Sequence, residues 1–85
     1  MEVMLNINAY DPARGMRFNW ENGHEINVRI DNKVVVVVAN EAGLVSLANH
    51  LVNLAQQTIP SQDQFHLDDY NGLEDGSCEI IIEKK

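Results

Sequence analysis

The sequence predicts an α+β domain over residues 1–85, in which a mostly antiparallel sheet of five or six strands has one helix packed on one face. Two observations favour this class. One segment has the apolar spacing of a single amphipathic helix, and several short segments alternate apolar and polar residues, as half-buried strands do. The chain is 45% hydrophobic and 22% charged, which is typical of a folded domain and not of a disordered one.

Strands are expected where apolar residues recur at every second position, because successive side chains of a strand point to opposite faces. Loop length then sets the pairing register. A three-residue loop over residues 21–23, with Gly23 left-handed, would pair Phe18 with Ile26. The period-two sets are Val3, Leu5 and Ile7; Met16, Phe18 and Trp20; Ile26, Val28 and Ile30; Phe65 and Leu67; and Cys78, Ile80 and Ile82.

Five consecutive valines, Val34–Val38, form the most apolar of these strands. A two-residue loop, Asp31-Asn32, would pair Val28 with Val35, so that the odd-numbered valines face the helix and the even-numbered ones face away. One helix cannot cover both faces of a sheet. The outward valines are therefore either shaded by long side chains such as Arg29 or covered by another protein. Because an exposed valine edge favours aggregation, we expect this strand to be central.

The helix is predicted over Glu41–Gln57. Asn40 is a good N-cap, Glu41 puts negative charge in the first turn, and Pro60 closes the segment. His50 lies at the border of the apolar stripe and is interpreted as a boundary residue. Asn49, Asn53 and Gln56 are assigned to the solvent side. The stripe consists of Leu44, Leu47, Ala48, Leu51, Leu54 and Ala55.

The formal charge of the chain is −7, and most of it lies in the last third. Such a surface repels phosphate backbones and anionic lipids, so neither nucleic acid nor a membrane is expected as a partner. A basic protein would instead be attracted and steered. Residues 59–85 contain Asp63, Asp68, Asp69, Glu74, Asp75, Glu79 and Glu83 against only Lys84 and Lys85.

The single cysteine and the N-terminal composition indicate a cytoplasmic location. Cys78 cannot form an internal disulfide, and it lies on the inward parity of its strand, where a thiol acts as a small hydrophobe. The N-terminus has neither a basic leader nor a long apolar run, and the run Val34–Ala39 is too short to cross a bilayer.

The segment FHLDDYNGLEDGSCEIII, residues 65–82, holds the densest group of polar side chains. His66 and Asp68 lie two apart on an expected strand and could share a metal or a proton, with His24 or His50 as further ligands. The alternative is a solvated strand face. The residue order of a calcium loop and the G-x-S-x-G signature of a serine nucleophile are both missing. We therefore expect no catalytic residue, no metal site and no cofactor.

Three stretches, NEAGLVSLANHLVNLA, FHLDD and LEDGSCEIII, resemble the bacterial immunity protein 32 family of polymorphic toxin systems in order and spacing. They cover about half of the chain. The resemblance implies a small cytoplasmic protein that binds and neutralises a cognate toxin and so protects the cell that makes it. It implies no catalytic residue.

We interpret the protein as a non-enzymatic binding module for a basic protein toxin. We expect the acidic segment from His66 to Asp75 to form a hairpin that docks the partner through His66, Asp68, Asp69, Tyr70, Glu74 and Asp75. An alternative is a homo-oligomeric structural or interaction module without a toxin partner, in which a second copy, for example in a homodimer, covers the valine stripe. A further alternative is a small metal-dependent enzyme that uses His66 and Asp68.

Overall fold

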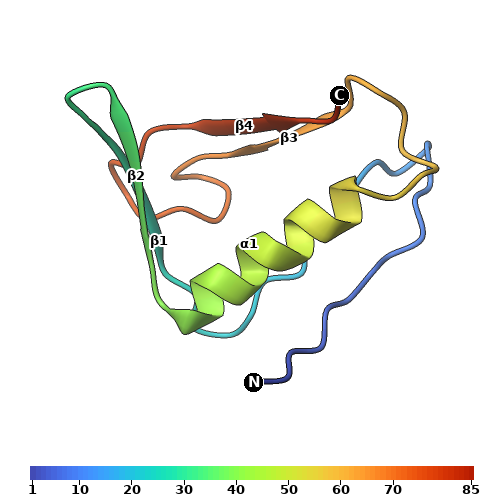
Figure 1. The fold of residues 1–85 in the computed structure, drawn as a ribbon, viewed down its shortest axis with the longest axis horizontal. Helices are drawn as coiled ribbons and strands as arrows, with labels where there is room; N and C mark the ends of the chain where they lie inside the picture. Colours follow the sequence, from blue (N-terminus) through green and yellow to red (C-terminus); the bar gives the residue numbers. More distant parts are fainter.

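The computed structural model describes residues 1–85 and has one helix and four strands, which form two separate antiparallel two-stranded sheets (Figure 1). Strand β1 (Ile26–Asp31) pairs with β2 (Val34–Ala39), and helix α1 (Glu41–Leu54) follows; β3 (Gln64–Leu67) then pairs with β4 (Ile80–Glu83). The α+β class and the single helix are confirmed. The prediction of one sheet with five or six strands is wrong.

The N-terminal segment forms no strand because its backbone is hydrogen-bonded to side chains of the helix. The Asn6 N–H donates to Asn49 Oδ1, and the Asn8 N–H donates to Asn53 Oδ1 at 2.9 Å. Asn53 Nδ2 donates in return to the Asn6 carbonyl at 2.7 Å. Backbone groups that are satisfied in this way do not pair with a neighbouring strand. The apolar alternation of residues 3–7 therefore did not produce a strand, and Val3 and Ile7 remain exposed.

Residues 16–20 show a second departure from the expected sheet. Met16, Phe18 and Trp20 are half-buried against the core, as their alternation predicts, but their backbone joins no ladder. The predicted pairing of Phe18 with Ile26 is therefore wrong. The Phe18 ring instead packs edge-on against Phe65, with 5.9 Å between the ring centroids. The period of two correctly indicated which side chains point inward, but it did not indicate what the backbone contacts.

The hairpin of β1 and β2 turns one residue later than predicted. Its loop is Asn32-Lys33, not Asp31-Asn32, and both loop residues have positive φ, at 49° and 68°, as a type I′ turn requires. Val28 consequently pairs with Val37 and not with Val35. Because the partner of Val28 changes by two positions, each valine stays on the face that was predicted for it. The odd-numbered valines therefore still face α1.

Strand β2 lies at the edge of its sheet, so the prediction of a central strand is wrong. β1 has β2 on one side and the loop that precedes β4 on the other. The Glu74 N–H donates to the Ile26 carbonyl and the Cys78 N–H donates to the Val28 carbonyl, both at 2.8 Å. No strand occupies the corresponding position beside β2.

The start of α1 is fixed by a cap and by a glycine. Asn40 is the N-cap, as predicted, and its side chain accepts the Gly43 N–H at 2.8 Å. A Cβ at Gly43 would lie 2.6 Å from the Glu25 carbonyl oxygen and 2.8 Å from Ile26 Cγ1. Only glycine lets the helix begin this close to β1. The buried apolar core consists of Ile26, Val28, Leu54, Ile59, Phe65, Leu67 and Leu73.

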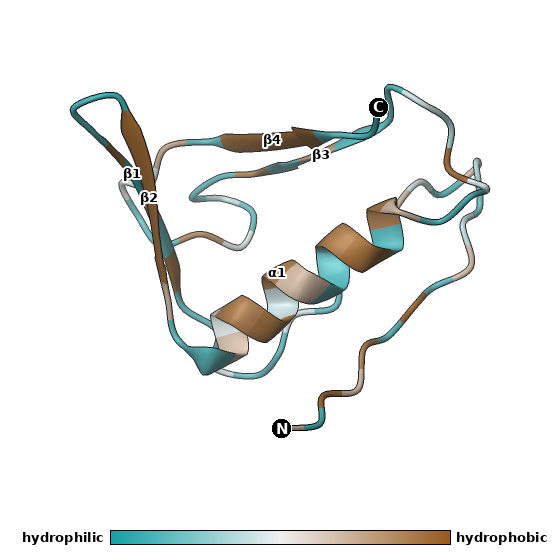
Figure 2. Cartoon of the chain, viewed as in Figure 1, coloured by the Kyte–Doolittle hydropathy of each residue, from teal (hydrophilic) through white to brown (hydrophobic).

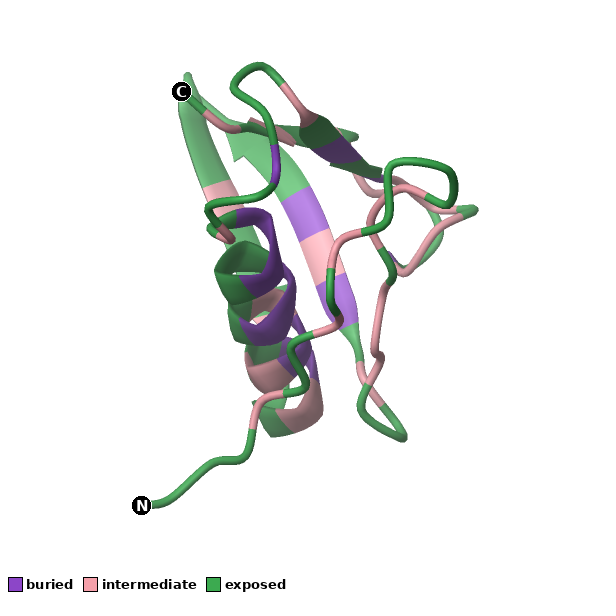
Figure 3. Ribbon diagram, turned by 90° about the vertical axis from the view of Figure 1, so that its right-hand side faces the viewer, coloured by how far each residue is buried: buried purple, intermediate pink, exposed green.

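The helix is rotated away from the orientation that its apolar stripe predicts. Ser46, Asn49, His50 and Asn53 are buried, and Figure 3 shows that the buried positions gather on one side of the helix. The outer part of the leucine stripe is exposed. His50 is therefore not a boundary residue, and the assignment of Asn49 and Asn53 to solvent is wrong. Asn49 and Asn53 can be buried because the N-terminal segment supplies hydrogen-bond partners for their side chains, and the Ser46 hydroxyl accepts the Glu21 N–H at 2.8 Å.

The helix of 14 residues lacks the length and apolar character that a membrane crossing requires.

Candidate partner-binding surfaces

The acidic segment His66–Asp75 leaves β3 and enters a tight turn. Phe65 and Leu67 are buried, whereas His66 is exposed, as the alternation predicts. The strand ends at Leu67, so Asp68 and Tyr70 do not continue the outer strand face. The connection between β3 and β4 comprises residues 68–79 and is a long loop, not a tight hairpin.

The turn at residues 68–72 is fixed by its own hydrogen bonds. The Asn71 N–H donates to the Asp68 carbonyl at 3.0 Å, and Asp68 Oδ1 accepts the Tyr70 N–H at 2.9 Å. Asn71 Nδ2 donates to the His66 carbonyl at 2.8 Å. The Tyr70 side chain is 97% exposed at the tip of this turn. An aromatic ring is thus held outward on an ordered backbone.

Glu74 and Asp75 lie on a different part of the same loop. The backbone of Glu74 is bonded to β1, and the Ser77 hydroxyl accepts the Val28 N–H at 3.1 Å. Gly72 sits against the Trp20 ring, where a Cβ would come within 2.0 Å of the ring. These contacts fasten the loop to the body of the protein, so its carboxylates extend from a fixed support.

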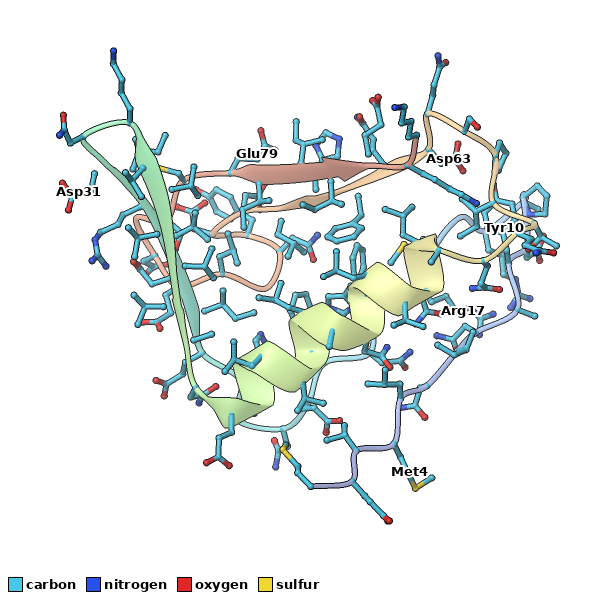
Figure 4. The ribbon with its side chains drawn as sticks, viewed as in Figure 1. Met4, Tyr10, Arg17, Asp31, Asp63 and Glu79 are labelled. Carbon is cyan, nitrogen blue, oxygen red and sulfur yellow. The ribbon has the colours of Figure 1, made fainter.

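The carboxylates of residues 68–75, which we call the acidic loop, have no basic partner within the chain. The structure contains two ion pairs, Arg14 with Asp11 at 3.7 Å and His66 with Glu79 at 3.4 Å. Both pairs are exposed, and such pairs contribute little to stability. Glu79 and the hairpin residue Asp31 point outward from the body (Figure 4). Neither ion pair involves Asp68, Asp69, Glu74 or Asp75.

The residues considered for a metal site do not come together. His24 stacks on Trp20 with 4.4 Å between the ring centroids, and its Nε2 lies 3.0 Å from the Gly72 carbonyl. His50 is buried on the inner side of α1, whereas His66 is exposed and contacts Glu79. No group of three or more histidine, cysteine or carboxylate side chains is placed to hold a metal ion.

His50 is a buried residue that sequence reasoning misplaced. It is 0% exposed, and its ring meets Trp20 at 4.5 Å and Phe18 at 4.9 Å between centroids. Neither ring nitrogen has a hydrogen-bond partner. Burial, and secondly the charge of His24, lowers the pKa of His50 from 6.5 to about 4. The neutral ring is therefore part of an aromatic cluster and not a ligand at the surface.

An apolar groove is the second candidate surface, and the expected sheet did not predict it. Eight apolar side chains line a cavity of about 280 Å³, two from each of β2, α1, β3 and β4. Val35 and Val37 contribute from β2, and Leu47 and Leu51 contribute from α1. Figure 2 shows these hydrophobic segments facing one another. Leu47 and Leu51 belong to the predicted leucine stripe, so the middle of that stripe faces the groove.

A larger hollow lies at the C-terminal end of α1. Its volume is about 680 Å³, and it has Leu54 and Ile59 on its apolar side and Asp63 and Glu83 on its acidic side. The Tyr10 hydroxyl donates a hydrogen bond to Asp63 Oδ2 at 3.1 Å, and Figure 4 shows the two residues close together. Burial and the Asp63 carboxylate raise the pKa of Tyr10. This hollow is separate from the acidic loop.

Comparison with known proteins gives one match. The model of a family described as Immunity protein 32 matches residues 34–85, which is more than half of the chain. The matched region begins at β2 and includes α1, the acidic loop and both strands of the second sheet. No curated protein and no solved structure matches the chain.

Proposed function

The chain belongs to the Immunity protein 32 family, and on that basis we propose that it binds a cognate protein toxin and neutralises it by direct contact. The family match is the observation that carries this proposal. Immunity protein families are generally non-enzymatic inhibitors. Neutralisation by contact needs only a surface that occupies or distorts the toxin, and it needs no reaction catalysed by the inhibitor.

The acidic loop is the proposed docking surface, through His66, Asp68, Asp69, Tyr70, Glu74 and Asp75. Its carboxylates have no basic partner within the chain, and Tyr70 stands almost fully exposed on a hydrogen-bonded turn. Tyrosine is among the residues that most often dominate binding energy at protein interfaces. A rigid turn also lowers the entropy that is lost when the ring becomes buried.

The partner surface should be basic. The chain has a net charge of −7, and complementary charge raises association rates more than it raises affinity. In this proposal the carboxylates accelerate capture of the toxin, whereas Tyr70 slows its release.

The test requires the cognate toxin, which would first be sought among the neighbouring genes of the host, and measures association by stopped flow at several salt concentrations. A fourfold variant, with Asp68, Asp69, Glu74 and Asp75 changed to the corresponding amides, should associate about tenfold more slowly and depend less on salt. The matched control neutralises four exposed carboxylates elsewhere, at Glu2, Glu21, Asp31 and Glu83. Equal association rates for the two variants would show that the acidic loop is not the docking surface. If the unchanged protein does not bind the toxin, the proposed function is wrong.

A further inference from the structure

The free edge of β2 exposes backbone groups that are ready to pair. The Asn40 N–H donates to the Glu25 carbonyl, toward β1. Backbone direction alternates along an antiparallel strand, so the even-numbered residues of β2 also bond to β1. The N–H and carbonyl groups of Val35, Val37 and Ala39 therefore point away from β1, and no segment of the chain pairs with them. Such an edge is a template for another strand.

An uncovered apolar surface continues from this edge onto the helix. Val35 is 61% exposed, Leu44 is 56% exposed and Leu51 is 48% exposed. Helix α1 contacts β2, and Leu47 and Leu51 line the same groove as Val35 and Val37; no segment of the chain crosses in front of β2 or α1 in Figure 1. A molecule that adds a strand to β2 would therefore also meet the exposed stripe of α1.

We propose that the occupant is a second copy of this chain, whose β2 pairs antiparallel with the first around a two-fold axis at Val37. The dimer would contain a four-stranded sheet in the order β1-β2-β2-β1. Both helices would lie on the same face of this sheet, with Leu44 and Leu51 of each copy in their contact. Such isologous pairing requires a self-complementary surface, and a strand of five identical valines supplies one.

The charges that flank β2 fit this arrangement. Residues 34–40 carry no charge, and the nearest charged residues on either side are Lys33 and Glu41. An axis at Val37 places Val35 opposite Ala39 of the other copy, and it brings Lys33, in the turn before β2, and Glu41 of the other copy, at the start of α1, to the same end of the paired strands. Opposite charges therefore meet at both ends of the paired strands. The unpaired carboxylates of residues 68–75 lie beyond β1, on the loop bonded to the side of β1 away from β2.

The first test is sedimentation equilibrium of the purified protein over a range of concentrations, with no toxin present, so it is independent of the proposed function. The unchanged chain should approach twice its mass of 9.6 kDa. In Val37→Pro, the lost N–H points to the free edge and is not needed by the hairpin, so the variant should fold and dimerise at least tenfold more weakly. A mass of 9.6 kDa at every concentration would overturn the proposal.

A charge swap tests the register without disturbing the backbone. Lys33→Glu and Glu41→Lys each place like charges at the same end of the paired strands, so each should weaken the dimer severalfold. The double variant should restore the affinity. If neither single change weakens the dimer, or if the double variant is weaker than both, the proposed pairing is wrong.

A matched pair of lysine substitutions tests the helix contact. Leu51→Lys introduces a charge into the proposed interface and should weaken the dimer at least tenfold. Ile81→Lys makes the same kind of change at a similarly exposed position on β4, where Ile81 is opposite His66 and outside the proposed contact. Equal effects of the two substitutions would contradict the proposed dimer.

Discussion

The two strands of the first hairpin reverse the usual relation between hydrophobicity and burial. β1, with the sequence INVRID, contains two charged residues and one asparagine, yet Ile26 and Val28 are completely buried. β2, with the sequence VVVVVA, is entirely apolar, yet four of its five valines are exposed. The difference is one of position, because β1 lies between β2 and the loop of residues 74–78, whereas β2 has a neighbour on one side only. Composition therefore does not decide which strand belongs to the core.

Helix α1 repeats the same contrast between its two sides. The buried side carries Ser46, Asn49, His50 and Asn53, and the exposed side carries Leu44 and Leu51. The polar side is buried where hydrogen-bond partners from the N-terminal segment and residue 21 meet it. The apolar side borders the groove beside β2. Exposed apolar surface of this kind is characteristic of sites that contact other proteins.

The largest expected effect comes from the buried strand. Ile26→Ala removes a fully buried side chain from the core and should lower the free energy of unfolding by about 2–5 kcal/mol. Val35→Ala, on the exposed strand, should lower it by less than about 1 kcal/mol in dilute protein. Urea denaturation measures both values. Similar losses at the two positions would show that β2 is as well packed as β1.

The next effect concerns pH and the buried side of α1. His50 has a pKa of about 4 when folded and about 6.5 when unfolded, so the unfolded chain binds the proton more readily as the pH falls. Stability should therefore be unaffected by His50 above pH 7 and should decrease between pH 6.5 and pH 4, by up to about 3 kcal/mol. In His50→Leu this part of the pH dependence should disappear. The check is urea denaturation at a series of pH values, and an unchanged pH profile in the variant would contradict the assignment.

A smaller effect is expected where the helix meets β1. Alanine is the better helix former by about 1 kcal/mol, but at Gly43 its Cβ would clash with the Glu25 carbonyl and Ile26. Gly43→Ala should therefore destabilise the protein by a net amount of about 1–3 kcal/mol. Ala48→Gly, at an exposed helical position, is the control and should cost about 1 kcal/mol through helix propensity alone. A thermal unfolding midpoint that rises in Gly43→Ala would show that the contact is looser than the structure indicates.

Local signals in the sequence predicted the parts of the fold that local interactions determine. The N-cap at Asn40, the left-handed Gly23 and the alternation of Phe65 and Leu67 all depend on residues near them in the chain, and the structure confirms each one. The family resemblance at the helix and the acidic loop is also confirmed.

The arrangement of these elements depends on contacts between distant residues, which periodicity does not report. Asn49 and Asn53 have the sequence pattern of solvent-facing residues, and only the presence of the Asn6 and Asn8 backbone makes their burial favourable. The same contacts withdrew residues 1–8 from the expected sheet. The edge position of β2 follows, because the loop at residues 74–78 occupies the open side of β1 and no strand remains for β2. The sequence did contain one indication that β2 is unusual. In a strand that buries one face, apolar and polar residues alternate, and the valine run shows no such alternation.

Amide hydrogen exchange along β2, followed by NMR at several protein concentrations, tests most directly whether this strand has a free edge. In dilute protein, the amides of Val36 and Val38 should be protected by β1 and those of Val35 and Val37 should exchange rapidly. Protection of Val35 and Val37 should then increase with concentration as the second copy binds. Equal protection of all four amides at the lowest concentration would place β2 inside a sheet within a single chain and would contradict the account.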